Sequence, residues 1–378
     1  MHYASSWIEL SRSAFDHNVS QYRAMLGPSV ALTIVVKSNA YGHGLAQMAQ
    51  LCQEHPAVDA LHVVLLSDAL LLRAQGITKP IIVLQSLDAD IEQALRQSIT
   101  ISVHDRYHLA LINAKARAIN IPASVHIEVD TGLTRLGFMP AEIPALVQYI
   151  TTELSHIRIT GIWSHFAESD ALDISYTTKQ HQQFAQLLVS IAPMVPADLH
   201  IHLANSTGAA RFTDKRFTMV RCAGGILGFA KSEQVQQEIR ALYPNFSLQP
   251  LLTWKTRVMA LKDVPADTFV GYARSYQTAR VTRTAVVPVG YYDGYVRALS
   301  NKGSMLVNGY LAPVIGRVSM TATVLDVTDI PSVVHNDEVI VMGPHAGVSV
   351  YDHAQLTDTI GYEVITRINP LLPRIIVN

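Results

Sequence analysis

The chain has 378 residues, of which 49% are hydrophobic and 16% charged, a composition that predicts folded domains and is long enough for two hydrophobic cores. A formal net charge of −1 favours neither a nucleic acid nor an anionic membrane as partner. The two cysteines, Cys52 and Cys222, have no metal-binding spacing, and we recognise neither a membrane-spanning run nor a signal peptide, so we expect a cytoplasmic protein.

From residue 31 onward, strand-like apolar runs alternate with amphipathic helical stretches. We predict strands at Ala31–Lys37, Ala60–Leu66, Pro80–Gln85, Ile99–Asp105, Ser124–Asp130, Ile157–His165, Leu199–Asn205 and Thr218–Leu227. We predict helices at Leu45–Gln53, Asp90–Gln97, Tyr107–Ala118, Ala141–Glu153 and Thr177–Ile191. Eight such units indicate an α/β fold, a (β/α)₈ barrel over residues 11–238. A doubly wound sheet is the rival architecture, but the glycine fingerprint G-x-G-x-x-G does not follow the first strand.

Residues 239–378 have a different pattern, with little long helical periodicity, and predict a smaller, mostly antiparallel β-domain. Asn308-Gly309 between two apolar pairs is typical of a type I′ hairpin. Trp7–Leu10, in the first ten residues, could add a strand to this domain. The remaining strands that we predict are Thr256–Leu261, Ala285–Val289, Met305–Val307 and Glu338–Met342.

Lys37 stands at the end of the first apolar run and before a polar loop with glycines at 42 and 44. A lysine at the carboxyl end of a buried strand is partly desolvated, which lowers the pKa of its amine and favours Schiff-base chemistry. Pyridoxal phosphate is the obvious carbonyl partner. A solvated lysine at a strand end remains the alternative.

Polar residues also gather at other predicted strand ends, where a barrel carries its chemistry. His126, Glu128 and Asp130 share one face of their strand, which we expect to look into the mouth of the barrel. Arg135 reaches the same rim, and its guanidinium could bind a carboxylate or a phenolate. The alternative is a surface arginine paired with a nearby acid.

Two later strands end in possible phosphate sites. Asn205 and Ser206 begin a helix-like stretch, which suits either a phosphate or an ordinary N-cap. Arg221 is followed by Gly224-Gly225, where the backbone could approach a phosphate or simply make a tight turn.

We expect hydrogen-bonding roles rather than a metal for His165, His200 and His202, because they do not form a pair four residues apart with a carboxylate. We therefore predict that the protein binds no metal ion.

Taken in order, the motifs resemble the bacterial alanine racemase family over nearly the whole chain. They are KSNAYGHG (37–44), VDTGLTR (129–135), WSHFA (163–167), HLANS (202–206), MVR (219–221), GYA (271–273), VGYYDG (289–294), GRVSM (316–320) and GYEV (361–364). The resemblance implies a pyridoxal-phosphate barrel followed by a β-domain, assembled as a head-to-tail homodimer. It implies an enzyme that interconverts L-alanine and D-alanine and supplies D-alanine for peptidoglycan.

The same resemblance implies roles for individual residues. Lys37 would carry the cofactor as an aldimine, and Tyr272 of the partner subunit would face it from the other side. Arg135 would touch the cofactor phenolate and the substrate carboxylate, and Arg221 would face the pyridine nitrogen. The cofactor phosphate would be held by Tyr41, Ser206, Tyr362 and backbone N–H groups near Gly224, and Asn205 and His165 would also bind the cofactor. Met320 and Tyr291 of the partner subunit would shape the substrate pocket, with Glu128 and His202 as supporting residues.

Racemisation needs two acid–base groups on opposite faces of a planar intermediate, which suits Lys37 and Tyr272. The unperturbed pKa of a tyrosine is about 10, so His165 is expected to help Tyr272 ionise. Because an arginine stays charged, Arg221 should disfavour protonation of the pyridine nitrogen and so limit transamination.

The chain departs from the family pattern at the barrel rim and in the pocket. Many relatives carry a carbamylated lysine where Glu128 stands, and we expect the glutamate to hold Arg135 without carbon dioxide. Thr321 replaces a frequent aspartate, and Cys222-Ala223-Gly224-Gly225 replaces the commoner turn. These changes leave a broader serine and alanine racemase open. A related barrel decarboxylase and a non-catalytic pyridoxal-phosphate carrier also remain open.

Overall fold

The computed structural model describes residues 5–212, 214, 216–230 and 233–378. Within them the chain forms two compact units. Residues 16–37 and 48–248 make the first, called here the barrel unit, and residues 5–15, 38–47 and 249–378 make the second, called the β unit. The helices that the structure describes are all too short or too polar to cross a bilayer.

The barrel unit is built on an eight-stranded parallel sheet, ordered β8-β7-β6-β5-β4-β3-β2-β9. The strands are β2 (Ala31–Val35), β3 (Ala60–Leu65), β4 (Ile81–Ser86), β5 (Thr100–Val103), β6 (Ala123–Glu128), β7 (Ile157–Trp163), β8 (His200–His202) and β9 (Met219–Cys222). The two ends of this order meet, because Arg221 N donates to Ala204 O and a parallel bridge joins Asn205 to Arg221. The predicted α/β barrel is therefore confirmed.

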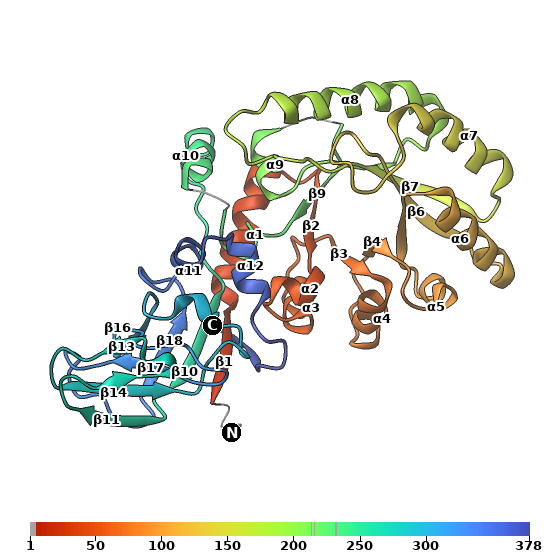
Figure 1. Cartoon of the computed structure of the whole chain (residues 1–378). Helices are drawn as coiled ribbons and strands as arrows, with labels where there is room; N and C mark the ends of the chain where they lie inside the picture. The colour runs from red at the N-terminus through yellow and green to blue at the C-terminus, as the bar shows by residue number, and fades with distance from the viewer. Residues whose placement is uncertain (1–4, 213, 215, 231–232) are drawn as a thin grey trace. The chain divides into compact units, whose positions relative to one another are not determined.

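Helices follow the strands along the outside of the sheet (Figure 1). They are α1 (Arg12–Leu26), α3 (Leu45–Glu54), α4 (Leu66–Ala74), α5 (Ile91–Arg96), α6 (Arg106–Ile119), α7 (Ile143–Glu153), α8 (Ser175–Ile191) and α9 (Ser206–Arg211), while α10 (Glu233–Leu242) contacts α9. Their apolar residues bury against the sheet, as Leu109, Ile112 and Ala116 of α6 do. Period-2 strands and period-3.6 helices thus alternate as the sequence pattern indicates.

Several strands end earlier than predicted. β7 stops at Trp163 rather than His165, β8 is only three residues long, and β9 stops at Cys222. In each case polar residues or glycines follow, and the chain turns away from the sheet there. The predicted site residues therefore lie at the carboxyl ends of the strands, as Arg221 does, or in the loops just beyond them, as Lys37 and His165 do.

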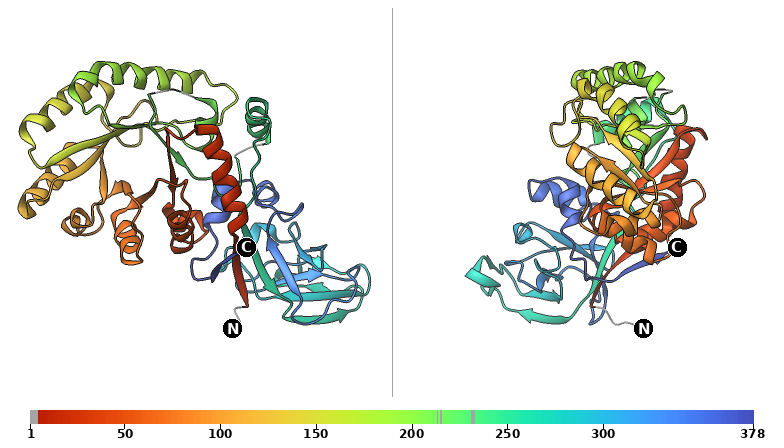
Figure 2. Two further views of the ribbon diagram at one scale, coloured as in Figure 1. Left: turned by 180° about the vertical axis from the view of Figure 1, so that it is seen from behind. Right: turned by 90° about the vertical axis from the view of Figure 1, so that its right-hand side faces the viewer.

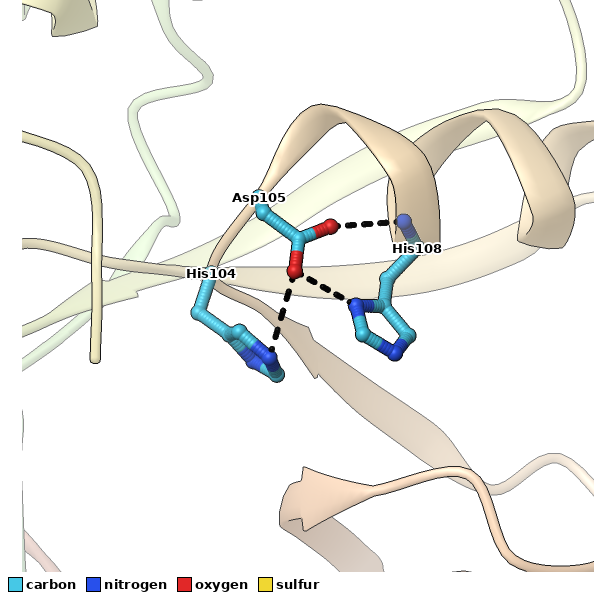
Figure 3. A group of neighbouring side chains, drawn as sticks. All are labelled: His104, Asp105 and His108. Atoms are coloured by element: carbon cyan, nitrogen blue, oxygen red, sulfur yellow. Dashed lines mark hydrogen bonds and ion pairs between the residues drawn. The ribbon is translucent and has the colours of Figure 1, made fainter.

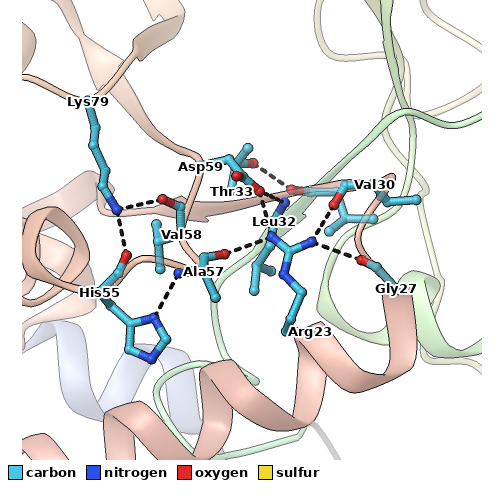
Figure 4. Close-up of polar contacts among 11 residues, drawn as sticks. Arg23, Gly27, Val30, Leu32, Thr33, His55, Ala57, Val58, Asp59 and Lys79 are labelled. Carbon is cyan, nitrogen blue, oxygen red and sulfur yellow. Dashed lines mark hydrogen bonds and ion pairs between the residues drawn. The ribbon is translucent and has the colours of Figure 1, made fainter.

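Two cations fasten the loops at the amino ends of β2 and β3 (Figure 4). Arg23 of α1 donates to the carbonyl oxygens of Gly27 (2.9 Å), Val30 (2.8 Å) and Ala57 (2.7 Å), and to Asp59 Oδ2 (2.6 Å). Lys79 Nζ donates to the carbonyl oxygens of His55 and Val58, both at 2.6 Å. These charged donors satisfy carbonyl groups that the adjoining strands leave unpaired.

The β unit holds a six-stranded sheet, a three-stranded sheet and a two-stranded ribbon, mostly antiparallel as predicted (Figure 2). The six-stranded order is β16-β15-β18-β10-β1-β19, the three-stranded order is β11-β14-β17, and β12 pairs with β13. Their bounds are β1 (Ser6–Ser11), β10 (Leu252–Arg257), β11 (Ala260–Val264), β12 (Phe269–Val270), β13 (Tyr276–Gln277), β14 (Thr282–Val287), β15 (Ser304–Val307), β16 (Tyr310–Pro313), β17 (Thr323–Asp326), β18 (Glu338–Met342) and β19 (Arg374–Val377). Two short helices, α11 (Val350–Leu356) and α12 (Gly361–Thr366), complete the unit.

β1 pairs antiparallel with β10 and parallel with β19, so the first strand of the chain belongs to the sheet of the β unit. The hairpin at Asn308-Gly309 is confirmed, since these residues have φ of 50° and 83° between the paired strands β15 and β16. Buried side chains such as Trp254, Tyr295 and Met305 belong to one hydrophobic cluster in this unit.

The predicted strand Thr256–Leu261 is wrong. The chain leaves the six-stranded sheet at Arg257, and β11 starts a different sheet at Ala260. The alternation of apolar residues continues through β10 and β11, and it contains no sign that the two strands pair in different sheets. The sequence pattern therefore predicted one strand where the structure has two.

Candidate active site

Lys37 lies two residues after the end of β2, and burial lowers the pKa of its amine. The positive charges of Arg135 and Arg221 lower this pKa further. An amine in these surroundings loses its proton more readily and becomes a better nucleophile. The lysine singled out in the sequence is therefore largely buried and lies near two positive charges.

The chain makes a left-handed turn immediately after Lys37. Ser38, Asn39 and Ala40 all have φ near 50° and ψ between 44° and 55°, although none of them is a glycine. Asn39 Oδ1 accepts a hydrogen bond from Leu45 N at 2.8 Å and so ties the turn to the start of α3. Consecutive non-glycine residues in this region are strained, and such strain is typical of functional sites.

Tyr41 ends this turn, and its ring lies 5.5 Å from the ring of Tyr362. Gly42 allows the approach, because a side chain at its position would come within 2.0 Å of Ile365 O in the same helix as Tyr362. Two residues that lie far apart in the sequence and that the resemblance assigns to the phosphate are therefore neighbours in the β unit.

Arg221 is buried at the end of β9 and binds the two histidines predicted for the site. Its Nη1 lies 2.6 Å from Nδ1 of His202, and its Nη2 lies 3.0 Å from Nδ1 of His165. Nη2 also donates to Ser164 O at 2.8 Å, and the guanidinium lies 4.6 Å from the ring centre of Trp163. Arg221, His165 and His202 thus form one hydrogen-bonded group.

The arginine determines which ring nitrogen of each histidine carries the proton. A guanidinium can only donate, so Nδ1 of His165 and Nδ1 of His202 must accept, and their protons lie on Nε2. Burial and the positive charge of Arg221 lower the pKa of both imidazoles well below the usual value. Both rings are therefore neutral at physiological pH.

The hydrogen-bonded group continues deeper into the barrel. His202 Nε2 lies 3.0 Å from His126 Nδ1, so His202 donates and His126 accepts. The ring of Trp163 stacks on that of His202 at 5.7 Å, and the ring of His62 in β3 lies 5.6 Å from that of His202. His62 stands out in the sequence as a single histidine inside the apolar run of β3. Its proximity to His202 depends on the order of the strands in the sheet and cannot be read from the sequence.

Ser206 and Gly224 also come together. Ser206 Oγ accepts hydrogen bonds from Ala223 N (2.8 Å) and Gly225 N (3.3 Å), which places the hydroxyl in the turn after β9. Asn205 Oδ1 accepts from Gly208 N at 2.9 Å and caps α9, so an N-cap describes this side chain.

Glu128 and Arg135 do not form the hydrogen bond that we expected. Glu128 is buried and its Oε2 has no hydrogen-bond partner among the described residues, whereas Arg135 is exposed. Asp130 Oδ1 accepts from Gly132 N and Thr134 N and holds the loop that carries Arg135. Burial raises the pKa of Glu128 to about 7, although the charges of Arg135 and Arg221 oppose this rise.

Tyr272, Tyr291 and Met320 lie on exposed loops of the β unit, with 69%, 43% and 56% of their surface exposed. Tyr291 N donates to Ser319 O, so the loops of Tyr291 and Met320 run side by side. Exposed apolar residues of this kind mark interaction surfaces. The structure thus separates the predicted site residues into a buried cluster around Arg221 and an exposed group on the β unit.

Comparison with known proteins assigns the fold and this cluster to a family. The profile described as "Alanine racemase, N-terminal domain" matches residues 10–231, and "Alanine racemase, C-terminal domain" matches residues 251–376. An alanine racemase of Halothermothrix orenii is 36% identical over 373 residues, which cover 98% of this chain and 96% of that protein.

Solved structures agree with this assignment. The crystal structure of alanine racemase from Streptomyces lavendulae, a producer of D-cycloserine, superposes with a TM-score of 0.90 at 31% identity, covering 100% of this chain and 98% of that one. Alanine racemase from Bacillus anthracis with bound L-Ala-P superposes with a TM-score of 0.88 at 28% identity, covering 100% and 96%. The fold is a (β/α)₈ barrel joined to a β unit, with a lysine and two arginines grouped at the barrel mouth. The chain belongs to the alanine racemase family of isomerases.

Proposed function

We propose that this protein interconverts L-alanine and D-alanine with pyridoxal 5′-phosphate and supplies D-alanine for peptidoglycan. The observation that carries the proposal is the position of Lys37 after β2, beside Arg135 and Arg221, where burial and these two charges lower the pKa of its amine. Family membership supports the reaction, and the Bacillus anthracis relative has L-Ala-P bound. A cytoplasmic homodimer is part of the proposal, with Tyr272 of the partner subunit completing each site.

The donor groups of the chain fit pyridoxal phosphate. Lys37 offers an amine of lowered pKa for the aldehyde, and Arg221 offers a permanent positive charge to the ring nitrogen. Ser206, in the turn that contains Gly224, would bind the phosphate together with Asn205, Tyr41 and Tyr362. When bound, the cofactor supplies an electron sink that makes the α-proton of an amino acid acidic.

Lys37 and Tyr272 of the partner subunit would then move protons on opposite faces of the substrate. Lys37 takes or returns the α-proton on its own face, and Tyr272 does so on the other. His165 keeps its proton on Nε2 because Nδ1 accepts from Arg221, so it can donate to the Tyr272 oxygen and favour the phenolate. Arg135 would bind the substrate carboxylate, and Met320 and Tyr291 would border the pocket.

The test incubates the enzyme in D₂O with a panel of L-amino acids, alanine and serine first. The products are separated by chiral chromatography. We expect D-alanine as product, with deuterium at the α-carbon. Lys37→Ala should abolish exchange, and Tyr272→Phe should slow one direction of exchange more than the other.

Different products would indicate a different protein. Evolved carbon dioxide would indicate a decarboxylase, and equal turnover of serine would indicate a broader racemase. A bound cofactor without any product would leave a carrier protein. All of these proteins absorb light at the aldimine band as the proposed enzyme does, so only the product analysis separates them.

A further inference from the structure

Three residues outside the proposed active site form a compact group of metal-ligating side chains (Figure 3). His104 follows β5, Asp105 caps α6, and His108 lies in the first turn of α6. One ligand atom from each residue lies within 4.8 Å of the other two. His104 Nε2 is 3.5 Å from Asp105 Oδ2, and His108 Nδ1 is 2.7 Å from the same oxygen.

The two oxygens of Asp105 have separate tasks. Oδ1 accepts from the backbone N of His108 at 2.7 Å and caps the helix. Oδ2 takes no part in the cap and faces both imidazoles (Figure 3). Helix capping therefore occupies one oxygen of Asp105, whereas the second accepts from His108 Nδ1 and also faces His104.

His104 is the least satisfied member of the group. Its side chain is 10% exposed, and its Nδ1 is buried without a hydrogen-bond partner among the described residues. Nε2 points toward Asp105 Oδ2 at a distance too long for a good hydrogen bond. A neutral imidazole at this position has a lone pair available for a metal.

A cavity of about 450 Å³ opens beside the two histidines. Gln85 and Ser86 of β4 line it, together with Leu136, the residue after Arg135. The cavity gives an ion access from solvent and leaves room for a water molecule as a further ligand. A catalytic or exchangeable zinc site has this composition, three protein ligands and one open position.

We propose that His104, Asp105 and His108 bind a divalent transition metal ion, and that Zn²⁺ is the ion of choice. Two imidazoles and a carboxylate are typical zinc ligands, with bonds of about 2.0–2.2 Å. In a tetrahedral site such bonds separate the ligand atoms by about 3.4 Å. The distance of 3.5 Å between His104 Nε2 and Asp105 Oδ2 already fits this value. The distance of 2.7 Å between His108 Nδ1 and Asp105 Oδ2 increases when the metal replaces the proton between these two atoms.

An ordinary histidine–aspartate pair is the simpler explanation, and the chain contains one for comparison. His181 Nε2 lies 3.0 Å from Asp214 Oδ2, and Arg216 neutralises that carboxylate at 2.6 Å. Within the described residues, Asp105 has two histidines and no lysine or arginine as ion-pair partners. The carboxylate of Asp105 therefore retains its negative charge for a cation.

The spacing of the ligands is visible in the sequence. His104 and His108 are four positions apart with Asp105 between them, a pair that our prediction of no metal did not take into account. The same spacing brings the imidazoles together only because β5 ends at Val103 and α6 begins at Arg106, so that His104 lies before the helix and His108 within it.

The test uses the full-length protein without a histidine tag, loaded with its cofactor and treated with EDTA. Zinc per chain is measured by equilibrium dialysis against ZnCl₂ and elemental analysis, and the ion is located by anomalous scattering at the zinc edge in crystals. We expect one zinc ion per chain, with an anomalous peak between His104 and Asp105.

Three variants make the result specific. His104→Gln and His108→Gln should each lose the zinc, and Asp105→Asn should lose it while its side-chain oxygen still caps the helix. His181→Gln removes a histidine from the comparison pair and should bind zinc as the parent does. Circular dichroism confirms that each variant is folded.

The proposal is overturned if the parent binds no zinc, or if His104→Gln and the parent bind equal amounts. An anomalous peak elsewhere, with none at His104, overturns it as well. None of these readouts depends on racemase activity, so the proposal stands or falls separately from the proposed function.

Discussion

Arg221 Nη1 lies 2.6 Å from Nδ1 of His202, and this contact makes a neutral imidazole, rather than a carboxylate, the partner of the buried arginine. A carboxylate at this place would neutralise the arginine and would favour protonation of the cofactor's ring nitrogen. The neutral histidines His165 and His202 leave the positive charge of Arg221 in place. We expect this charge to control the side reactions of the cofactor.

Replacing Arg221 with glutamate should raise the ratio of pyridoxamine formation to racemisation, because a negative charge favours protonation of the pyridine nitrogen and lengthens the life of the carbanion. Both products are quantified by chromatography after incubation with alanine. Arg221→Lys keeps the positive charge and should keep the ratio low. An unchanged ratio in Arg221→Glu would end this account of the arginine.

His126 should stabilise the fold through His202. Replacing it with phenylalanine leaves the Nε2 proton of His202 without an acceptor in a buried site, at a cost of about 1–3 kcal/mol of unfolding free energy. Urea unfolding measures the difference. His200→Gln is the control, since the His200 ring lies 6.0 Å from His126 and is exposed. Equal losses in the two variants would contradict the role of the hydrogen bond.

Glu128 should free the enzyme from carbon dioxide. The side chain of Glu128 has no amine that carbon dioxide could carbamylate, so activity in degassed buffer should not change when bicarbonate is added. Glu128→Lys is the informative counterpart, because it restores the residue that can be carbamylated and should introduce a response to bicarbonate. Clear stimulation of the parent protein would refute the prediction.

Glu128 should make the stability of the fold depend on pH. Its pKa is raised to about 7 in the folded state, so between the unfolded pKa of 4.5 and pH 7 the folded chain binds the extra proton. The contribution of Glu128 to the free energy of unfolding is therefore fully present below pH 4.5 and is lost as the pH rises through 7. Glu128→Gln should gain stability relative to the parent as the pH rises over this range, by at most about 3 kcal/mol.

Thermal unfolding of both cofactor-free proteins from pH 5 to pH 8 tests this sign. Parallel curves for Glu128→Gln and the parent would show that Glu128 titrates normally.

Arg23 should be a major contributor to stability although it is far in sequence from every predicted site residue of the barrel mouth. Arg23→Met leaves three loop carbonyl groups without their donor and leaves Asp59 Oδ2 with Leu32 N as its donor, and we expect a loss of about 2–3 kcal/mol. Calorimetry gives the value. Lys115→Met removes an exposed ion pair with Glu92 and should have a much smaller effect, because solvent screens exposed ion pairs. The prediction fails if the two variants melt alike.

Local patterns along the chain were enough to locate most of the elements and the lysine. Apolar alternation and helical periodicity are local properties, so they marked the eight barrel strands and, in the β unit, β1, β14, β15 and β18. Asn308-Gly309 encodes its own turn, because its backbone preferences do not depend on distant residues. Lys37 was recognisable because it directly follows a buried run.

The meeting of the polar groups, in contrast, depends on how the strands are arranged in space. The left-handed turn at Ser38, Asn39 and Ala40 has no glycine to announce it, and the break between β10 and β11 follows from a change of sheet. His126 and His202 are separated by 76 positions, and Arg221 reaches His202 across 19, so their hydrogen bonds depend on strand order and register. Local patterns determine dihedral angles and burial, whereas contacts between distant residues arise from the closure of the barrel.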